Sequence, residues 1–187
     1  MTTATIDRAT EIYQAATPVI RINGVGGSRW KRNVAKGGRI GPWLQADYEI
    51  LDQFTWGTRT PCLYLVAGAD QLIRYVGISR NRMKDRWRES PAYDAETMTL
   101  WPKKQLFHSQ CWKQIEREHA SNPKARFEVR CISADKLLPL LERQGPPLSG
   151  LCALRGDDEG IVAAVERWLC NNKSEQLVSW NISMTGK

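Results

Sequence analysis

Two tyrosines and a group of arginines lie in one stretch of this sequence. Tyr64 and Tyr75 are eleven positions apart, in two apolar runs that a turn at 67–70 separates, and the basic segment 81–89 follows them. The runs and the turn predict an antiparallel β-hairpin, and the basic segment has the spacing of a helix. Two strands and a helix would place both tyrosine hydroxyls beside guanidinium groups. That arrangement suits contact with a phosphate group, because a guanidinium binds phosphate oxygens in a planar, permanently charged geometry.

Helices and strands elsewhere in the chain must position this stretch. Alternation of apolar and polar residues predicts a further strand at 126–132, and apolar residues at helical spacing predict several helices. The predicted helices span residues 7–16, 44–54, 81–89, 109–119, 134–144 and 158–170. Together with the hairpin, this pattern predicts an α/β fold with a small, mainly antiparallel three-stranded central sheet flanked by helices.

The segment 21–43 is rich in glycine, has no acidic residue and shows neither helical nor strand periodicity. Its basic residues are Arg21, Arg29, Lys31, Arg32, Lys36 and Arg39. Flexible cationic chain can follow a phosphate backbone, because its N–H groups and its side chains both reach phosphate oxygens. We therefore predict a nucleic-acid-binding arm here, and a solvated surface loop is the alternative. Three basic residues after the hairpin are predicted to contact nucleic acid as well, namely Arg80, Arg82 and Lys84.

Composition limits the classes of protein to which the chain can belong. Its 187 residues are 42% apolar and include eight tryptophans, which is enough to bury a core. The net charge of +7 favours a polyanionic partner. The five cysteines are widely spaced and form no C-x-x-C pair, so neither a disulfide framework nor a zinc site is indicated. No apolar run reaches the roughly 20 residues of a membrane span and no signal peptide is evident, so a cytoplasmic protein without membrane contact is expected.

The order of these features resembles the GIY-YIG endonuclease superfamily. Leu63-Tyr64 stands where the family has the end of its first motif, and Tyr75-Val76-Gly77 is a close form of the second. The family then has an arginine on the next helix, a glutamate on a late helix and an asparagine after that glutamate. The residues at those places here are Arg86, Glu166 and Asn181. The resemblance covers residues 61–181.

The resemblance implies a catalytic site and a metal cofactor. Tyr64 would act as, or within, the general base that activates water, and Tyr75 would orient water or phosphate. Arg86 would contact a non-bridging phosphate oxygen, and Asn181 would complete the site. Glu166 would hold one Mg²⁺ (or Mn²⁺), which supplies charge to the phosphoryl oxygens and to the leaving oxygen.

The sequence departs from the family at two positions. Cys62 replaces the glycine of the first motif, a change that concerns packing more than catalysis. Ser90 stands four residues after Arg86, where the family often has a histidine or tyrosine that assists the base. His108 is the candidate to replace that group from a neighbouring helix, and His119 is a less favoured one.

Each candidate also has a structural alternative. The two tyrosines can be ordinary strand aromatics, and Asn181 can cap or cross-link backbone. Other residues compete for two of the assigned places: Arg80, Arg82 and Arg88 for the arginine, and Glu159 and Glu175 for the carboxylate.

The whole pattern predicts a helical and basic extension over 1–60 that grips DNA, followed by a nuclease domain over 61–187. The main hypothesis is an endonuclease that cleaves double-stranded DNA, with a role in restriction or in phage or mobile-element biology. A nucleic-acid-binding module that has lost cleavage is the alternative. A basic protein that docks acidic partners without nucleic acid is the third. The oligomeric state, the recognised sequence and the choice of DNA over RNA are left open.

Overall fold

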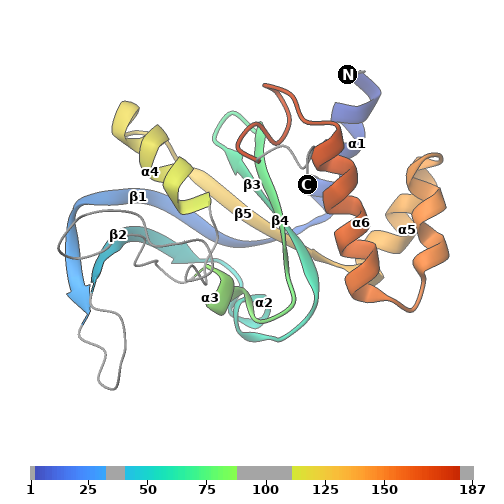
Figure 1. Ribbon diagram of the computed structural model, residues 1–187, viewed down its shortest axis with the longest axis horizontal. Helices are drawn as coiled ribbons and strands as arrows, with labels where there is room; N and C mark the ends of the chain where they lie inside the picture. The colour runs from blue at the N-terminus through green and yellow to red at the C-terminus, as the bar shows by residue number, and fades with distance from the viewer. Residues whose placement is uncertain (1–2, 33–40, 88–110, 182–187) are drawn as a thin grey trace.

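A computed structural model of the chain describes residues 3–32, 41–87 and 111–181, and describes no side chains over 26–45. A five-stranded sheet runs through the molecule in the order β2-β1-β5-β3-β4 (Figure 1), and every neighbouring pair is antiparallel. The strands are β1 (Thr17–Arg32), β2 (Gly41–Ile50), β3 (Cys62–Gly68), β4 (Ile73–Ser79) and β5 (Phe127–Ser133).

Helices cover the sheet on both faces. The α-helices are α1 (Thr3–Ala15), α2 (Gln53–Gly57), α3 (Met83–Arg86), α4 (Cys111–Ser121), α5 (Ala134–Gln144) and α6 (Asp158–Asn171), and Leu148–Leu154 forms a 3-10 helix. The α/β class is therefore confirmed, together with the hairpin, the strand near 126–132 and the helices near 7–16, 109–119, 134–144 and 158–170. The helix predicted at 81–89 is shorter, with α3 covering one turn.

The prediction of a three-stranded sheet is wrong, because β1 and β2 add two strands to it. The structure places strands over 17–32 and 41–50, where the sequence predicted an irregular arm and a helix at 44–54. Register shifts after Ile22 and Val25 interrupt the alternation in β1, so no strand period was visible. The segment that contains Ala46, Tyr48 and Ile50 alternates at period two, and these three side chains pack on the core as a strand requires.

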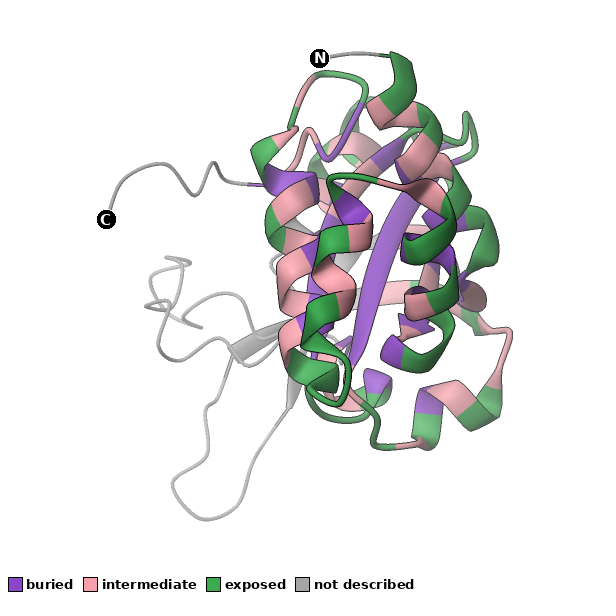
Figure 2. Ribbon diagram, turned by 90° about the vertical axis from the view of Figure 1, so that its right-hand side faces the viewer, coloured by how far each residue is buried: buried purple, intermediate pink, exposed green. Residues whose placement is uncertain are grey.

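Two clusters of buried side chains lie on the two faces of the sheet. Every residue of β3, which lies between β5 and β4, is buried, and its alternate side chains point to opposite faces. Leu63 and Leu65 pack with α1, α5 and α6, whereas Tyr64 and Val66 pack with α2, α3 and α4. Figure 2 faces the α5 and α6 side, where exposed residues lie on the outer surfaces of the helices and a buried strand lies behind them.

The outer edge of β4 is covered by chain that follows α6. The Val178 amide donates to the Ile73 carbonyl at 2.6 Å, and the Trp180 amide donates to the Arg74 carbonyl at 2.9 Å. These bonds satisfy backbone groups that an edge strand would otherwise leave open for pairing. Among the described residues, no helix combines the length and the apolar character that crossing a membrane requires.

Candidate active site

Tyr64 lies on β3, between β5 and the edge strand β4, and its side chain is fully buried. The residue paired with it on β4 is Gly77. A Cβ atom at Gly77 would lie within 2.5 Å of Tyr64 Cζ, so the tyrosine ring occupies the place that any other residue at 77 would fill. The glycine of the Tyr-Val-Gly motif therefore has a steric role, since it lets the Tyr64 hydroxyl lie across the neighbouring strand.

Arg86 and Tyr75 contact this tyrosine from α3 and β4. The Arg86 Nε donates to the Tyr64 hydroxyl oxygen at 3.1 Å, and the guanidinium carbon is 5.8 Å from the centre of the Tyr64 ring. The rings of Tyr64 and Tyr75 stack with centroids 6.1 Å apart and an interplanar angle of 24°. Two strands and a helix thus bring the two tyrosines and one arginine into a single cluster, as the sequence predicted.

Electrostatics distinguish the members of this cluster. Burial raises the pKa of Tyr75 far above its usual value, and the neighbouring Tyr64 raises it further, so Tyr75 keeps its proton. Burial by itself would lower the pKa of Arg86, but Tyr64, Tyr75 and Glu166 outweigh that effect and raise it. A half-buried, permanently charged guanidinium therefore lies against the Tyr64 hydroxyl.

Two tryptophans hold α3 and α4 against the cluster. The Trp87 ring packs edge-on against Tyr64 with centroids 5.6 Å apart, and Trp112 packs edge-on against Trp87 at 5.5 Å. Both indoles are buried, and neither N–H has a hydrogen-bond partner among the residues that the structure describes. Neither tryptophan is among the site residues predicted from the sequence, because the two are far apart along the chain.

Glu166 is coupled to the cluster from the opposite helical layer. It lies on α6, which packs beside β3 and β4 at the edge of the sheet (Figure 1). Burial raises the pKa of the Glu166 carboxyl, and Arg86, Arg80 and Arg167 only partly offset that rise. Glu166 is thus a half-buried carboxylate under the influence of the same guanidinium that contacts Tyr64.

Asn181 is bound to the backbone and not to the tyrosine cluster. Its side-chain amide donates to the Val76 carbonyl at 2.8 Å, and its oxygen accepts from the Val76 amide at 2.9 Å. The side chain is buried, so both of its polar ends are used on β4. Of the two roles left open by the sequence, the geometry favours the cross-link. Asn181 fixes the strand that carries Tyr75.

The predicted nucleic-acid contacts divide into three groups. Arg80, Arg82 and Lys84 are exposed, and the first two form ion pairs with Glu159 at 2.8 Å and with Asp85 at 2.7 Å. Arg29, Lys31 and Arg32 lie in β1, where their backbone pairs with β2, so at these positions the irregular arm is a strand. The remaining nucleic-acid candidates, Lys36 and Arg39, lie outside the described residues. The catalytic candidate His108 also lies outside them, as do Arg88 and Ser90.

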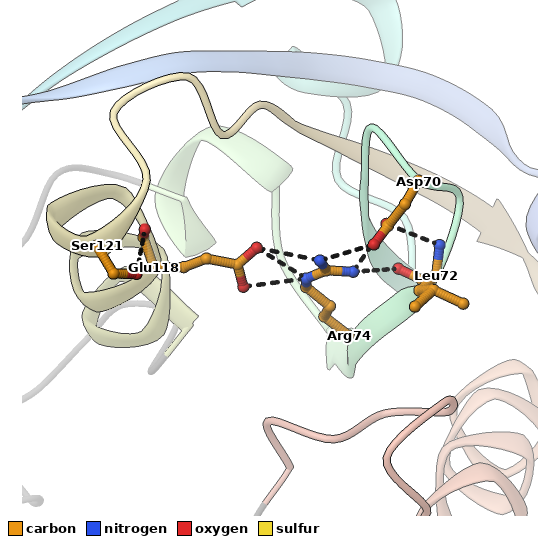
Figure 3. Close-up of polar contacts among 5 residues, drawn as sticks. All are labelled: Asp70, Leu72, Arg74, Glu118 and Ser121. Atoms are coloured by element: carbon orange, nitrogen blue, oxygen red, sulfur yellow. Dashed lines mark hydrogen bonds and ion pairs between the residues drawn. The ribbon is translucent and has the colours of Figure 1, made fainter.

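A second polar network near the hairpin turn was not predicted. The Arg74 guanidinium donates to both carboxylate oxygens of Asp70 at 2.9 and 3.0 Å, and to Glu118 of α4 at 3.0 to 3.2 Å (Figure 3). Its central carbon also lies 6.0 Å from the centre of the Trp180 ring. Glu118 is 44 positions from Arg74, so no local pattern could reveal this pairing. The network ties α4 to the strand that carries Tyr75.

A metal ion at Glu166 would have few protein ligands among the described residues. Within the described residues, no three His, Cys, Asp or Glu side chains are grouped to hold an ion. Glu166 is a single half-buried carboxylate, and Mg²⁺ is commonly held by one or two carboxylates together with water and substrate phosphates. Water and substrate phosphates would therefore have to supply the other ligands of an ion held by Glu166.

Comparison with known proteins adds no relative to this description. No protein-family model matches the sequence, and no curated protein or solved structure matches the chain.

Proposed function

We propose that this protein is a Mg²⁺-dependent DNA endonuclease of the GIY-YIG type. The observation that carries the proposal is the contact between Arg86 and the Tyr64 hydroxyl, beside Tyr75 and electrostatically coupled to Glu166. These residue types, in this order on two hairpin strands, the next helix and a late helix, are those that the resemblance assigns to phosphodiester hydrolysis. The extra strands β1 and β2 would extend the three-stranded sheet β4-β3-β5 expected of that fold.

Within this proposal each side chain has a distinct task. A guanidinium that donates to a phenol oxygen stabilises the phenolate form. Arg86 would therefore increase the fraction of Tyr64 that is deprotonated, and only that phenolate form could accept a proton from the attacking water. The terminal nitrogens of Arg86 are assigned to a non-bridging phosphate oxygen. Tyr75 retains its proton and donates, which suits it to orient water or phosphate. When bound at Glu166, Mg²⁺ would supply positive charge to the phosphoryl and leaving oxygens.

Charge supports a nucleic acid as the substrate. The chain carries a net charge of +7, and Arg80, Arg82 and Lys84 are exposed and close to Arg86 along the chain. Cationic side chains on phosphates supply most sequence-independent affinity for nucleic acid. Double-stranded DNA is the proposed substrate.

The proposal is tested by nicking of supercoiled plasmid with Mg²⁺, with Mn²⁺ and with EDTA. Glu166→Gln keeps the size of the side chain and removes its charge. We expect its cleavage rate to fall about 100- to 1000-fold, the usual cost of one such electrostatic interaction. Glu175→Gln is the matched control, because Glu175 is an exposed carboxylate close along the chain, and it should cleave at the parent rate. Cleavage that persists in EDTA, or equal loss in both variants, would contradict the assignment.

A second candidate function is nucleic-acid binding without cleavage. The observation that favours it is the complete burial of Tyr64, which suits a packing role as well as a chemical one. This function predicts salt-sensitive binding to DNA with no cut product on DNA or RNA under any metal condition. Glu166→Gln would then bind as the parent protein does.

A further inference from the structure

A cavity of about 440 Å³ opens at the start of β3, at the opposite end of that strand from the Asp70–Arg74–Glu118 network. Its walls come from α2, α3, β5 and the start of α5. Three of its lining residues carry sulfur, namely Cys62, Met83 and Cys131, and three charged residues also line it, namely Asp52, Asp135 and Lys136. The spacing of the cysteines in the sequence indicated neither a disulfide framework nor a zinc site. The cavity therefore gives solvent and small ions a path to otherwise buried sulfur atoms.

The three sulfur side chains lie together on one face of the sheet. The Cys62 Sγ is 3.8 Å from the Met83 Sδ, which joins β3 to α3. Cys131 pairs across the sheet with Tyr64, two residues after Cys62, so the two cysteines are diagonal neighbours on adjacent strands. The hydrogen bond with Cys62, together with burial, holds the pKa of Cys131 well above its usual range. Cys62 thus contacts both other sulfur groups.

We propose that Cys62, Cys131 and Met83 form a binding site for a soft monovalent metal ion of the Cu(I) class. Two sulfur ligands that share one ion at about 2.3 Å lie about 3.8 to 4.0 Å apart in tetrahedral or trigonal geometry. The Cys62–Met83 separation of 3.8 Å already has that value. Thiolate and thioether ligands are soft, and they favour Cu(I) over the hard ions that Glu166 would hold.

A disulfide explains this group less well than a metal ion does. Diagonal neighbours in an antiparallel sheet are about 7 to 8 Å apart at Cα, whereas a disulfide needs about 4.4 to 6.8 Å. A thioether cannot join a disulfide at all, yet Met83 is part of the group. A metal ion can take two thiolates and a thioether as ligands together.

Binding requires two protons to leave and no electron to move. The ion forms bonds to Cys62 Sγ, Cys131 Sγ and Met83 Sδ, and each thiol releases its proton to solvent. Lys136 favours the thiolate form of Cys131 by its charge, while Asp52 opposes it. Because thiol protons must be displaced, affinity should rise with pH across the neutral range. The site does not depend on the proposed nuclease activity.

The test is titration of the reduced full-length chain with Ag(I), a monovalent probe without redox chemistry, and with Cu(I) under anaerobic conditions against a competing chelator. We expect one ion per chain, with thiolate-to-metal absorbance in the ultraviolet. Cys62→Ser and Cys131→Ser should each weaken binding by more than about 100-fold, since even the outer partners of a metal site contribute 10- to 100-fold. Cys152→Ser and Cys170→Ser are the matched controls and should bind as the parent does.

Met83→Leu keeps the shape of the core and removes only the thioether, so it decides the question if the serine variants do not fold. We expect at least tenfold weaker binding, with an unchanged circular dichroism spectrum. X-ray absorption of the Cu(I)-loaded chain should show three sulfur neighbours. A shell that contains nitrogen or oxygen, equal binding in Met83→Leu, tighter retention of Zn²⁺ than of Ag(I), or retained binding in a folded Cys62→Ser/Cys131→Ser double variant would overturn the proposal.

Discussion

The glycine opposite Tyr64 is a steric requirement of the tyrosine cluster. Gly77→Ala would place a methyl group against the Tyr64 ring and force the ring or the strand to move. Overpacking of this kind costs about 1 to 3 kcal/mol. We expect a lower urea midpoint. We also expect a disturbed Arg86–Tyr64 hydrogen bond, so any cleavage activity should fall by a larger factor than the fraction of folded protein does. Gly57→Ala is the control, because nothing lies within 4 Å of its added Cβ.

The Glu166 carboxylate is expected to lower the free energy of unfolding at neutral pH, although it is proposed to act in the site. Its pKa is raised, so between the ordinary carboxyl pKa and the raised value the folded state binds more protons than the unfolded state. The free energy of unfolding therefore falls as pH rises through that window. Glu166→Gln removes the cost, so the variant should melt at a higher temperature than the parent at pH 7. The two proteins should converge near pH 4, and a parent that is more stable at pH 7 would refute this.

The contribution of Asn181 to stability can be measured separately from any contribution to catalysis. Asn181→Ala leaves the buried Val76 amide and carbonyl without their partners, at a cost of about 1 to 3 kcal/mol. We expect the same loss of stability in the parent and in the Glu166→Gln background, measured by urea unfolding. Asn171→Ala, at an exposed position, should change stability by less than about 0.5 kcal/mol. A loss of cleavage without a loss of stability would instead make Asn181 a catalytic residue.

Arg74 joins the hairpin to α4 through two carboxylates. Arg74→Met keeps much of the aliphatic volume and removes every charged hydrogen bond, at a cost of about 1.5 to 3 kcal/mol. Arg82→Met is the comparison, since its ion pair with Asp85 is exposed and should contribute less than about 1 kcal/mol. Thermal melting of the two variants measures the difference. Equal shifts would show that the Figure 3 network adds nothing beyond a surface pair.

Sequence patterns predicted those elements whose side chains repeat without interruption. The period of α6 and the alternation in β5 are regular, so both were located within a few residues. In β1 the register shifts after Ile22 broke the period, and in β2 a run of alternating residues also fitted a helix. The tyrosine cluster was predictable because its members are close along the chain. The bonds of Asn181 to Val76, 105 positions away, depend on the complete fold and leave no local pattern.

At the scale of the whole molecule, the positive charge predicts strongly salt-dependent binding to DNA. Affinity should fall by several decades between about 50 and 200 mM salt, as it does for proteins that neutralise many phosphates. Replacing Arg29, Lys31 and Arg32 by serine should reduce the slope of log affinity against log salt by about one for each phosphate that is no longer neutralised. Arg143→Ser/Arg155→Ser is the control, because these residues lie near the ends of α5 and the 3-10 helix, where they pair with Glu11 and Glu142. Equal slopes in all three proteins would remove β1 from the DNA interface.

The strand order also determines when the complete sheet can form during synthesis of the chain. β5 lies in the middle of the sheet between β1 and β3, yet it is the last of the five strands in the chain. During synthesis, the β1–β2 and β3–β4 hairpins leave the ribosome before they can pair with each other through β5. The strand β5, which joins them, is complete only when residue 133 has been added. Both hairpins then expose an open strand edge while residues 80–126 are made. The protein should therefore fold slowly and late, and its nascent chain should depend on chaperones that shield strand edges.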